Sequence, residues 1–118
     1  MRLLITTLTL LSGCGTQIRE IRTNPPPRAL TPRPATAVEV YTGHAPERAF
    51  VEIAYLEAQQ ESPASRDTPA DIFARLQERA GAIGCDAIYI TAPNNRVVEA
   101  VAGAQTLLGY SATCLVYR

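Results

Sequence analysis

The 118-residue sequence has no excess of charge of either sign, because 11 basic side chains balance 11 acidic ones. Proteins that bind nucleic acid usually carry a basic excess or a basic stripe, so the composition predicts no nucleic-acid partner. Histidine occurs once, as His44. The chain also lacks the P-loop, Rossmann, HExxH and GxSxG patterns. We therefore expect neither an enzyme nor a cofactor.

The sequence also lacks a hydrophobic run long enough to span a membrane. Its longest apolar segment, residues 3–11 (LLITTLTLL), would form a helix of about 14 Å, roughly half the thickness of a bilayer core. The segment follows the positively charged Met1-Arg2, and its length is typical of the hydrophobic region of a signal peptide. Small residues at 12 and 13 leave the backbone open to a peptidase.

The run Leu11-Ser12-Gly13-Cys14 resembles the lipobox of bacterial lipoproteins. The resemblance implies cleavage before Cys14, a diacylglyceryl group on its sulfur, and acylation of the new amino terminus by a fatty acid such as palmitate. Several acyl chains anchor a protein stably, whereas one is marginal. Gly15 in place of an aspartate implies the outer membrane, with the protein facing the periplasm. The alternative is a buried strand or helix over residues 3–14 that contains an incidental cysteine.

Residues 15–36 are rich in proline, with five prolines between positions 25 and 34. Proline excludes helix and favours extended polyproline II structure. The segment predicts a tether that could reach about 70 Å; the alternative is a ligand for an SH3-type groove. The expected organisation is a signal peptide over residues 1–13, a lipidated cysteine and tether over 14–36, and one domain over 37–118.

The domain is expected to contain strands with alternating or continuous apolar residues. These predicted strands cover residues 37–42, 50–58, 87–92 and 110–118. In the second strand, strict alternation would place Val51, Ile53 and Tyr55 on one face. Residues 96–109 are ambiguous between a strand with a loop and a short helix, and we favour irregular, hairpin-like structure there.

One helix is indicated between the second and third strands. Thr68 is suited to the N-cap, Pro69 to the first turn, Asp71 to the positive helix end and Gly84 to the C-terminal stop. An apolar stripe at helical spacing consists of Ile72, Phe73, Leu76, Ala80 and Ile83. The resulting order, β-β-α-β-β, predicts an α+β two-layer sandwich with one helix on a mostly antiparallel sheet.

Two segments carry a second resemblance. Gly84-Cys85-Asp86-Ala87 leads into a strand, and Ala112-Thr113-Cys114 lies in the terminal strand. Over about 45 residues the chain is similar to small envelope lipoproteins with an RcsF-like or YbjQ-like domain. The expected anchor, the tether and the lack of a reactive site predict a non-enzymatic lipoprotein that binds or supports an unidentified envelope protein or cell-wall component. One version is a stress sensor akin to the Rcs lipoprotein, and the other is an accessory or structural lipoprotein. The Rcs sensor has two disulfides in this domain, whereas only two cysteines remain here.

If lipid occupies Cys14, then Cys85 and Cys114 remain in an oxidising compartment. They fall on strands that could be neighbours, so we expect a disulfide. A bridge that closes about 30 residues would stabilise the domain by roughly 3.5 kcal/mol in the chain-entropy model. Two separate buried thiols, or a redox or metal role, are the alternatives. The absence of a CxxC motif leaves thioredoxin-like activity unsupported.

Other polar side chains offer weak candidates. His44 lies in a predicted turn without neighbouring ligands, so we expect an exposed loop residue; a small-ligand or metal-binding module is the alternative function. Three strand glutamates could form an acid/base pair, but solvation or pairing with arginines is expected instead. These residues are Glu39, Glu52 and Glu57, with Arg48 and Arg96 as partners. Five tyrosines fall on strands, where cross-strand pairing accounts for them and an exposed subset could form a binding face: Tyr41, Tyr55, Tyr89, Tyr110 and Tyr117.

Overall fold

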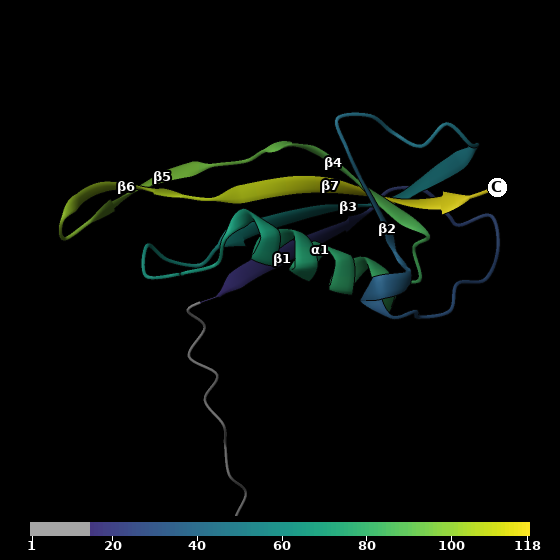
Figure 1. The fold of residues 1–118 in the computed structure, drawn as a ribbon, viewed down its shortest axis with the longest axis horizontal. Coiled ribbons are helices and arrows are strands. Elements are labelled where there is room, and N and C mark those ends of the chain that lie inside the picture. The colour runs from purple at the N-terminus through teal and green to yellow at the C-terminus, as the bar shows by residue number, and fades with distance from the viewer. Residues whose placement is uncertain (1–14) are drawn as a thin grey trace, which may run out of the picture.

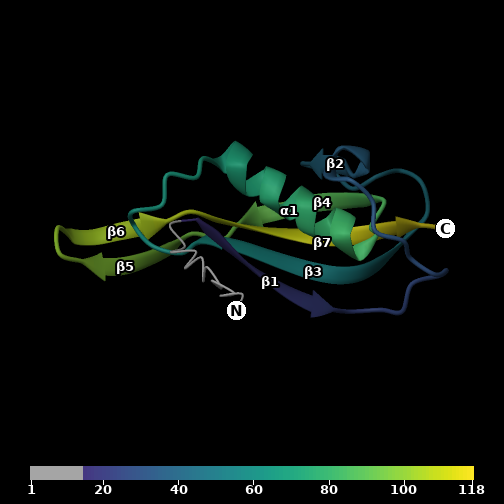
Figure 2. The ribbon, with the colours of Figure 1, turned by 90° about the horizontal axis from the view of Figure 1, so that it is seen from below.

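The computed structural model describes residues 15–118, so the expected signal peptide and Cys14 lie outside the described residues. A five-stranded sheet with the order β1-β3-β7-β4-β2 carries one helix on one face, and a two-stranded hairpin, β5–β6, extends from it (Figures 1 and 2). The elements are β1 (Thr16–Arg22), η1 (Ala35–Ala37), β2 (Glu39–Thr42), β3 (Phe50–Gln60), α1 (Pro69–Ile83), β4 (Ala87–Pro93), β5 (Arg96–Ala100), β6 (Gly103–Leu107) and β7 (Gly109–Tyr117).

The predicted fold class is confirmed: one helix packs on a mostly antiparallel sheet, and one disulfide is present. Among the neighbouring strands only β2 and β4 run parallel. Residues 96–107 form a regular antiparallel hairpin rather than the irregular structure favoured from the sequence. Gly103 adopts a φ of 106° just after the turn, a conformation that glycine accepts without strain.

The structure corrects the expected tether. Residues 16–22 are strand β1, which pairs antiparallel with β3 from Thr16 opposite Gln60 to Arg22 opposite Ala54. Ile18 packs against the buried core. The segment is a strand rather than a spacer because β3, the longest strand, would otherwise be an unpaired edge of the sheet, and β1 supplies the missing hydrogen-bond partners.

The proline-rich residues after β1 also follow the surface of the domain. The Thr23 amide donates to the Ile53 carbonyl at 3.0 Å, and the Arg33 amide donates to the Gly81 carbonyl at 2.8 Å. Gly81 permits this close approach, since a Cβ at that position would lie 2.5 Å from the Arg33 carbonyl oxygen. The folded unit therefore includes β1 and the proline-rich residues that follow it, and residues 23–37 form a strap across the end of α1.

Helix α1 has the predicted boundaries. Thr68 and Asp71 form a capping box, in which the Asp71 carboxylate accepts from the Thr68 amide at 2.8 Å, and Gly84 ends the helix in the left-handed region. The predicted stripe faces the sheet, with Ile72, Leu76, Ala80 and Ile83 buried. Phe73 is half-buried and packs edge-on against Tyr110, with ring centroids 4.8 Å apart.

A register shift in β3 changes the predicted strand faces. The irregularity between Glu52 and Ala54 buries both Ile53 and Ala54. Beyond it, Ala54 and Leu56 belong to the core cluster that contains the buried residues of α1, whereas Tyr55, which lies between them in the strand, is half-buried and outside that cluster. The prediction that Val51, Ile53 and Tyr55 share one face was wrong, because simple alternation cannot anticipate a bulge.

Candidate functional site

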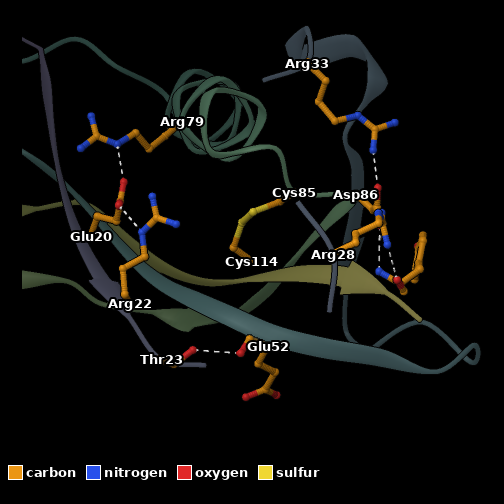
Figure 3. The surroundings of a disulfide bond; sticks show 11 residues. Glu20, Arg22, Thr23, Arg28, Arg33, Glu52, Arg79, Cys85, Asp86 and Cys114 are labelled. Atoms are coloured by element: carbon orange, nitrogen blue, oxygen red, sulfur yellow. Dashed lines mark hydrogen bonds and ion pairs between the residues drawn. A yellow bond between two sulfur atoms is a disulfide. The ribbon is translucent and has the colours of Figure 1, made fainter. Parts of the chain in front are cut away.

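A disulfide joins the end of the helix to the centre of the sheet (Figure 3). Cys85 follows the helix stop, Cys114 lies in β7, and their Cα atoms are 5.9 Å apart. Both residues are fully buried. The predicted pairing is confirmed, and the bonded, buried sulfurs offer neither a free thiol nor a metal ligand.

The next residue, Asp86, connects three segments that are distant in sequence. Its carboxylate accepts from the Arg28 guanidinium at 2.7 Å and the Arg33 guanidinium at 2.5 Å (Figure 3). It also accepts from the Tyr117 amide at 2.8 Å. Arg28 also donates to the Tyr117 carbonyl at 2.6 Å. The Asp86 carboxylate thereby holds the strap against the end of β7.

The electrostatics of Asp86 favour its charged form. Burial opposes ionisation, but the Tyr117 amide and the Arg28 guanidinium, reinforced by the charge of Arg33, outweigh it and hold the pKa of Asp86 below its usual value. Asp86 is therefore a structural anion rather than a proton carrier at neutral pH.

A second carboxylate lies at the same end of the sheet. Glu39 accepts hydrogen bonds from the Tyr41 hydroxyl at 2.5 Å and the Tyr117 hydroxyl at 2.8 Å, and these bonds lower the pKa of Glu39. Burial, together with the hydrogen bonds to Tyr41 and Glu39, raises the pKa of Tyr117. The Arg48 guanidinium stacks on the Tyr117 ring, 3.9 Å from its centroid, in a cation–π contact.

The three glutamates considered from the sequence do not form a site. β4 and β7 separate Glu39 from Glu52, and Glu57 lies five residues further along β3. Glu39 is exposed, as the expected solvation requires, and its carboxylate accepts from tyrosines rather than pairing with an arginine. Among the ion pairs of residues 15–118, none involves Arg48 or Arg96.

The side chains around Asp86 and Glu39 line a polar cleft of about 390 Å³, here called the arginine cleft. Its lining residues are Arg28, Arg33, Glu39, Arg48, Asp86, Tyr117 and Arg118. Four guanidinium groups face two carboxylates, so the lining side chains carry a net charge of +2. Arginine recognises carboxylate and phosphate groups through its planar set of donors. The cleft is thus suited to an anionic group.

The far end of β3 is where the described chain begins. The Thr16 hydroxyl donates to the Asp67 carboxylate at 2.6 Å, and the Glu61 amide donates to the Gly15 carbonyl at 3.0 Å. Further along β1, Glu20 pairs with Arg79 of α1 at 2.9 Å (Figure 3). These contacts fix the first described residues against the domain.

The sheet face opposite α1 carries most of the tyrosines. All five lie on strands, as predicted. Tyr117 belongs to a small cluster with Ala87 and Leu115, against which Tyr41 and Tyr89 pack. Cross-strand packing therefore accounts for three tyrosines of this face.

The remaining candidates are placed as follows. His44 is exposed, as predicted, and its Nδ1 lies 3.0 Å from the Ala45 carbonyl oxygen. Within residues 15–118, no three His, Cys, Asp or Glu side chains are grouped so as to hold a metal ion. The helix of this part of the chain is too short to cross a bilayer.

Comparison with known proteins gives little more. No family model and no curated protein matches the chain. A crystal structure of a Francisella virulence factor, FvfA, is similar at 13% sequence identity and a TM-score of 0.47, covering 81% of this chain and 96% of that one. A likeness of this degree carries no argument about function.

Proposed function

We propose that the chain is the precursor of a non-enzymatic envelope lipoprotein whose domain binds or supports another envelope component. The observation that carries the proposal is the sequence Leu11-Ser12-Gly13-Cys14 after a nine-residue apolar segment. The fold supports it, since β1 begins at Thr16, and a lipid on Cys14 would attach directly to a sheet strand.

This attachment would place one end of the domain next to the membrane and the opposite end away from it. The end with Gly15 would lie next to the bilayer. In this proposal the bilayer is the outer membrane, as the glycine after Cys14 implies, and the domain faces the periplasm. The arginine cleft lies at the other end of β3, whose 11 residues span about 33 Å. The cleft would therefore face away from the membrane, where it could accept an acidic or phosphorylated group of a protein or cell-wall partner.

Two roles are compatible with this arrangement. A stress sensor akin to the Rcs lipoprotein would report by contact with a membrane protein. An accessory or structural lipoprotein would use the same contact to hold its partner. We favour the accessory role, because the single bridge Cys85–Cys114 departs from the two disulfides of the Rcs sensor.

Inhibition of signal peptidase II in cells that express the full chain tests the proposal. We expect a precursor about 13 residues heavier to accumulate, and the mature protein to incorporate a labelled fatty acid. Cys14→Ala is the matched control and should abolish both the processing and the label. An unmodified Cys14 thiol in native protein, measured by mass spectrometry, would contradict the proposal.

A small-ligand module is the second candidate, and the arginine cleft favours an anionic ligand for it. Titration of the chain 15–118 with inorganic phosphate and with divalent metals separates the possibilities. Phosphate binding that Arg48→Ala weakens would support the small-ligand role. Micromolar metal binding that His44→Ala abolishes would instead establish the metal-binding alternative.

A further inference from the structure

The β5–β6 hairpin has an apolar tip that nothing in the described chain covers. Residues 100–104 read Ala-Val-Ala-Gly-Ala, without charge or hydrogen-bonding side chains. Val101 is fully exposed at the turn, and Val97 is 69% exposed. The two strands pair only with each other, in a separate two-stranded sheet. The tip is therefore held out in solvent, where exposed valine is unfavourable.

The hairpin starts beside the first described residues. The Gln60 amide donates to the Leu108 carbonyl at 2.9 Å, and the next amide, that of Glu61, donates to Gly15 at 3.0 Å. Figures 1 and 2 show the hairpin projecting beyond the end of the sheet at which β1 begins. Five residues of strand carry the tip about 17 Å from its base. The apolar tip and the attachment point of residues 1–14 thus belong to the same end of the domain.

We infer that the hairpin tip, residues 100–104, contacts the lipid bilayer beside the anchor. The inference rests on the proposed lipidation of Cys14, which would place Gly15 at the membrane surface. A lipid surface suits this tip better than a folded partner, because the tip has no polar side chain to specify one. The fully exposed Val101 would also remove apolar surface from water when it enters the bilayer.

The contact needs little affinity of its own. A lipid on Cys14 already confines the domain to the membrane, so insertion of the tip becomes an intramolecular step with a high effective concentration. Glu99, which is exposed and directly precedes the tip, limits the depth of insertion because a carboxylate is unfavourable in hydrocarbon. Two contacts, the anchor and the tip, would leave only rotation about the line that joins them, and would so limit the directions in which the arginine cleft can point.

Tryptophan fluorescence provides the test, because the native chain contains no tryptophan. Ala102→Trp places a single reporter at the tip, and Glu47→Trp places a matched reporter in the exposed loop before β3. Each full-length protein is processed in cells, purified, and reconstituted into phosphatidylethanolamine–phosphatidylglycerol vesicles with or without brominated acyl chains. We expect at least twofold stronger quenching at position 102 than at position 47, and loss of that difference when Val101→Asp is added.

The outcomes separate the two proposals. Protein that floats with the vesicles but shows equal quenching at both positions refutes the hairpin contact and leaves lipidation intact. Protein that does not float, with an unmodified Cys14, refutes the lipidation and removes the basis of the contact. A blue-shifted but unquenched tip reporter that depends on protein concentration overturns the inference in favour of contact with a second copy.

Discussion

Reduction of the Cys85–Cys114 bridge should remove a large share of the stability of this domain. The two residues are 29 positions apart, and the loop between them contains β4, the hairpin and half of β7. The chain-entropy model gives about 3.5 kcal/mol for closing a loop of this length. The model attributes the loss to the constraint that the bridge places on the unfolded chain, and both residues are fully buried in the folded one.

Urea denaturation of the chain 15–118, followed by far-UV circular dichroism with and without reductant, measures this difference. A domain of this size has a total stability of about 5–15 kcal/mol. The expected loss corresponds to a fall in Tm of roughly 15–25 °C. Cys85→Ala/Cys114→Ala is the control, and its unfolding should not respond to reductant. A loss below about 1 kcal/mol in the native sequence would refute the entropic argument.

Two further substitutions test contacts of the strap. Gly81→Ala should lower the free energy of unfolding, measured by urea denaturation, by about 1–3 kcal/mol, because the added Cβ would meet the Arg33 carbonyl oxygen. Helix propensity alone predicts the opposite, a gain of about 1 kcal/mol, and that result would contradict the close approach. Asp86→Asn should lower the free energy of unfolding by about 2 kcal/mol at pH 7, because it removes the charge that pairs with Arg28 and Arg33. The pKa of Asp86 is lower in the folded state than its value near 3.9 in the unfolded chain. The charged carboxylate therefore stabilises the fold fully above the unfolded-state pKa, and this contribution is lost as the pH falls through the folded-state pKa. The difference in unfolding free energy between the native and Asn proteins should therefore shrink as the pH falls below about 5, and a difference that does not change with pH would contradict a role for the Asp86 charge.

The elements that the sequence predicted correctly are those with local signals. Thr68, Asp71 and Gly84 define both helix ends through contacts within a few residues, so the helix could be located without tertiary information. The disulfide could be predicted because only two cysteines remained for one bridge. The hairpin was predicted only as irregular, hairpin-like structure, because its turn contains a single glycine and its strands contain few large residues.

The elements that were missed depend on distant partners. β1 is a strand because β3, about 40 residues later, offers an open edge, and the neighbouring prolines obscured the alternation around Ile18. The pairs of Asp86 with Arg28 and Arg33 span 58 and 53 residues. Nothing in the local sequence distinguishes these arginines from solvated ones. The arginine cleft was therefore not predictable, although each of its residues is visible in the sequence.

The antiparallel pairing of β1 with β3 has a mechanical consequence. If lipid holds the start of β1 while a partner pulls at the arginine cleft, the force runs along the strand axes. The ladder hydrogen bonds between β1 and β3 lie perpendicular to that force, so all seven residue pairs share it in shear rather than opening one after another. The segment that joins the domain to its anchor would then yield only when the whole strand slides.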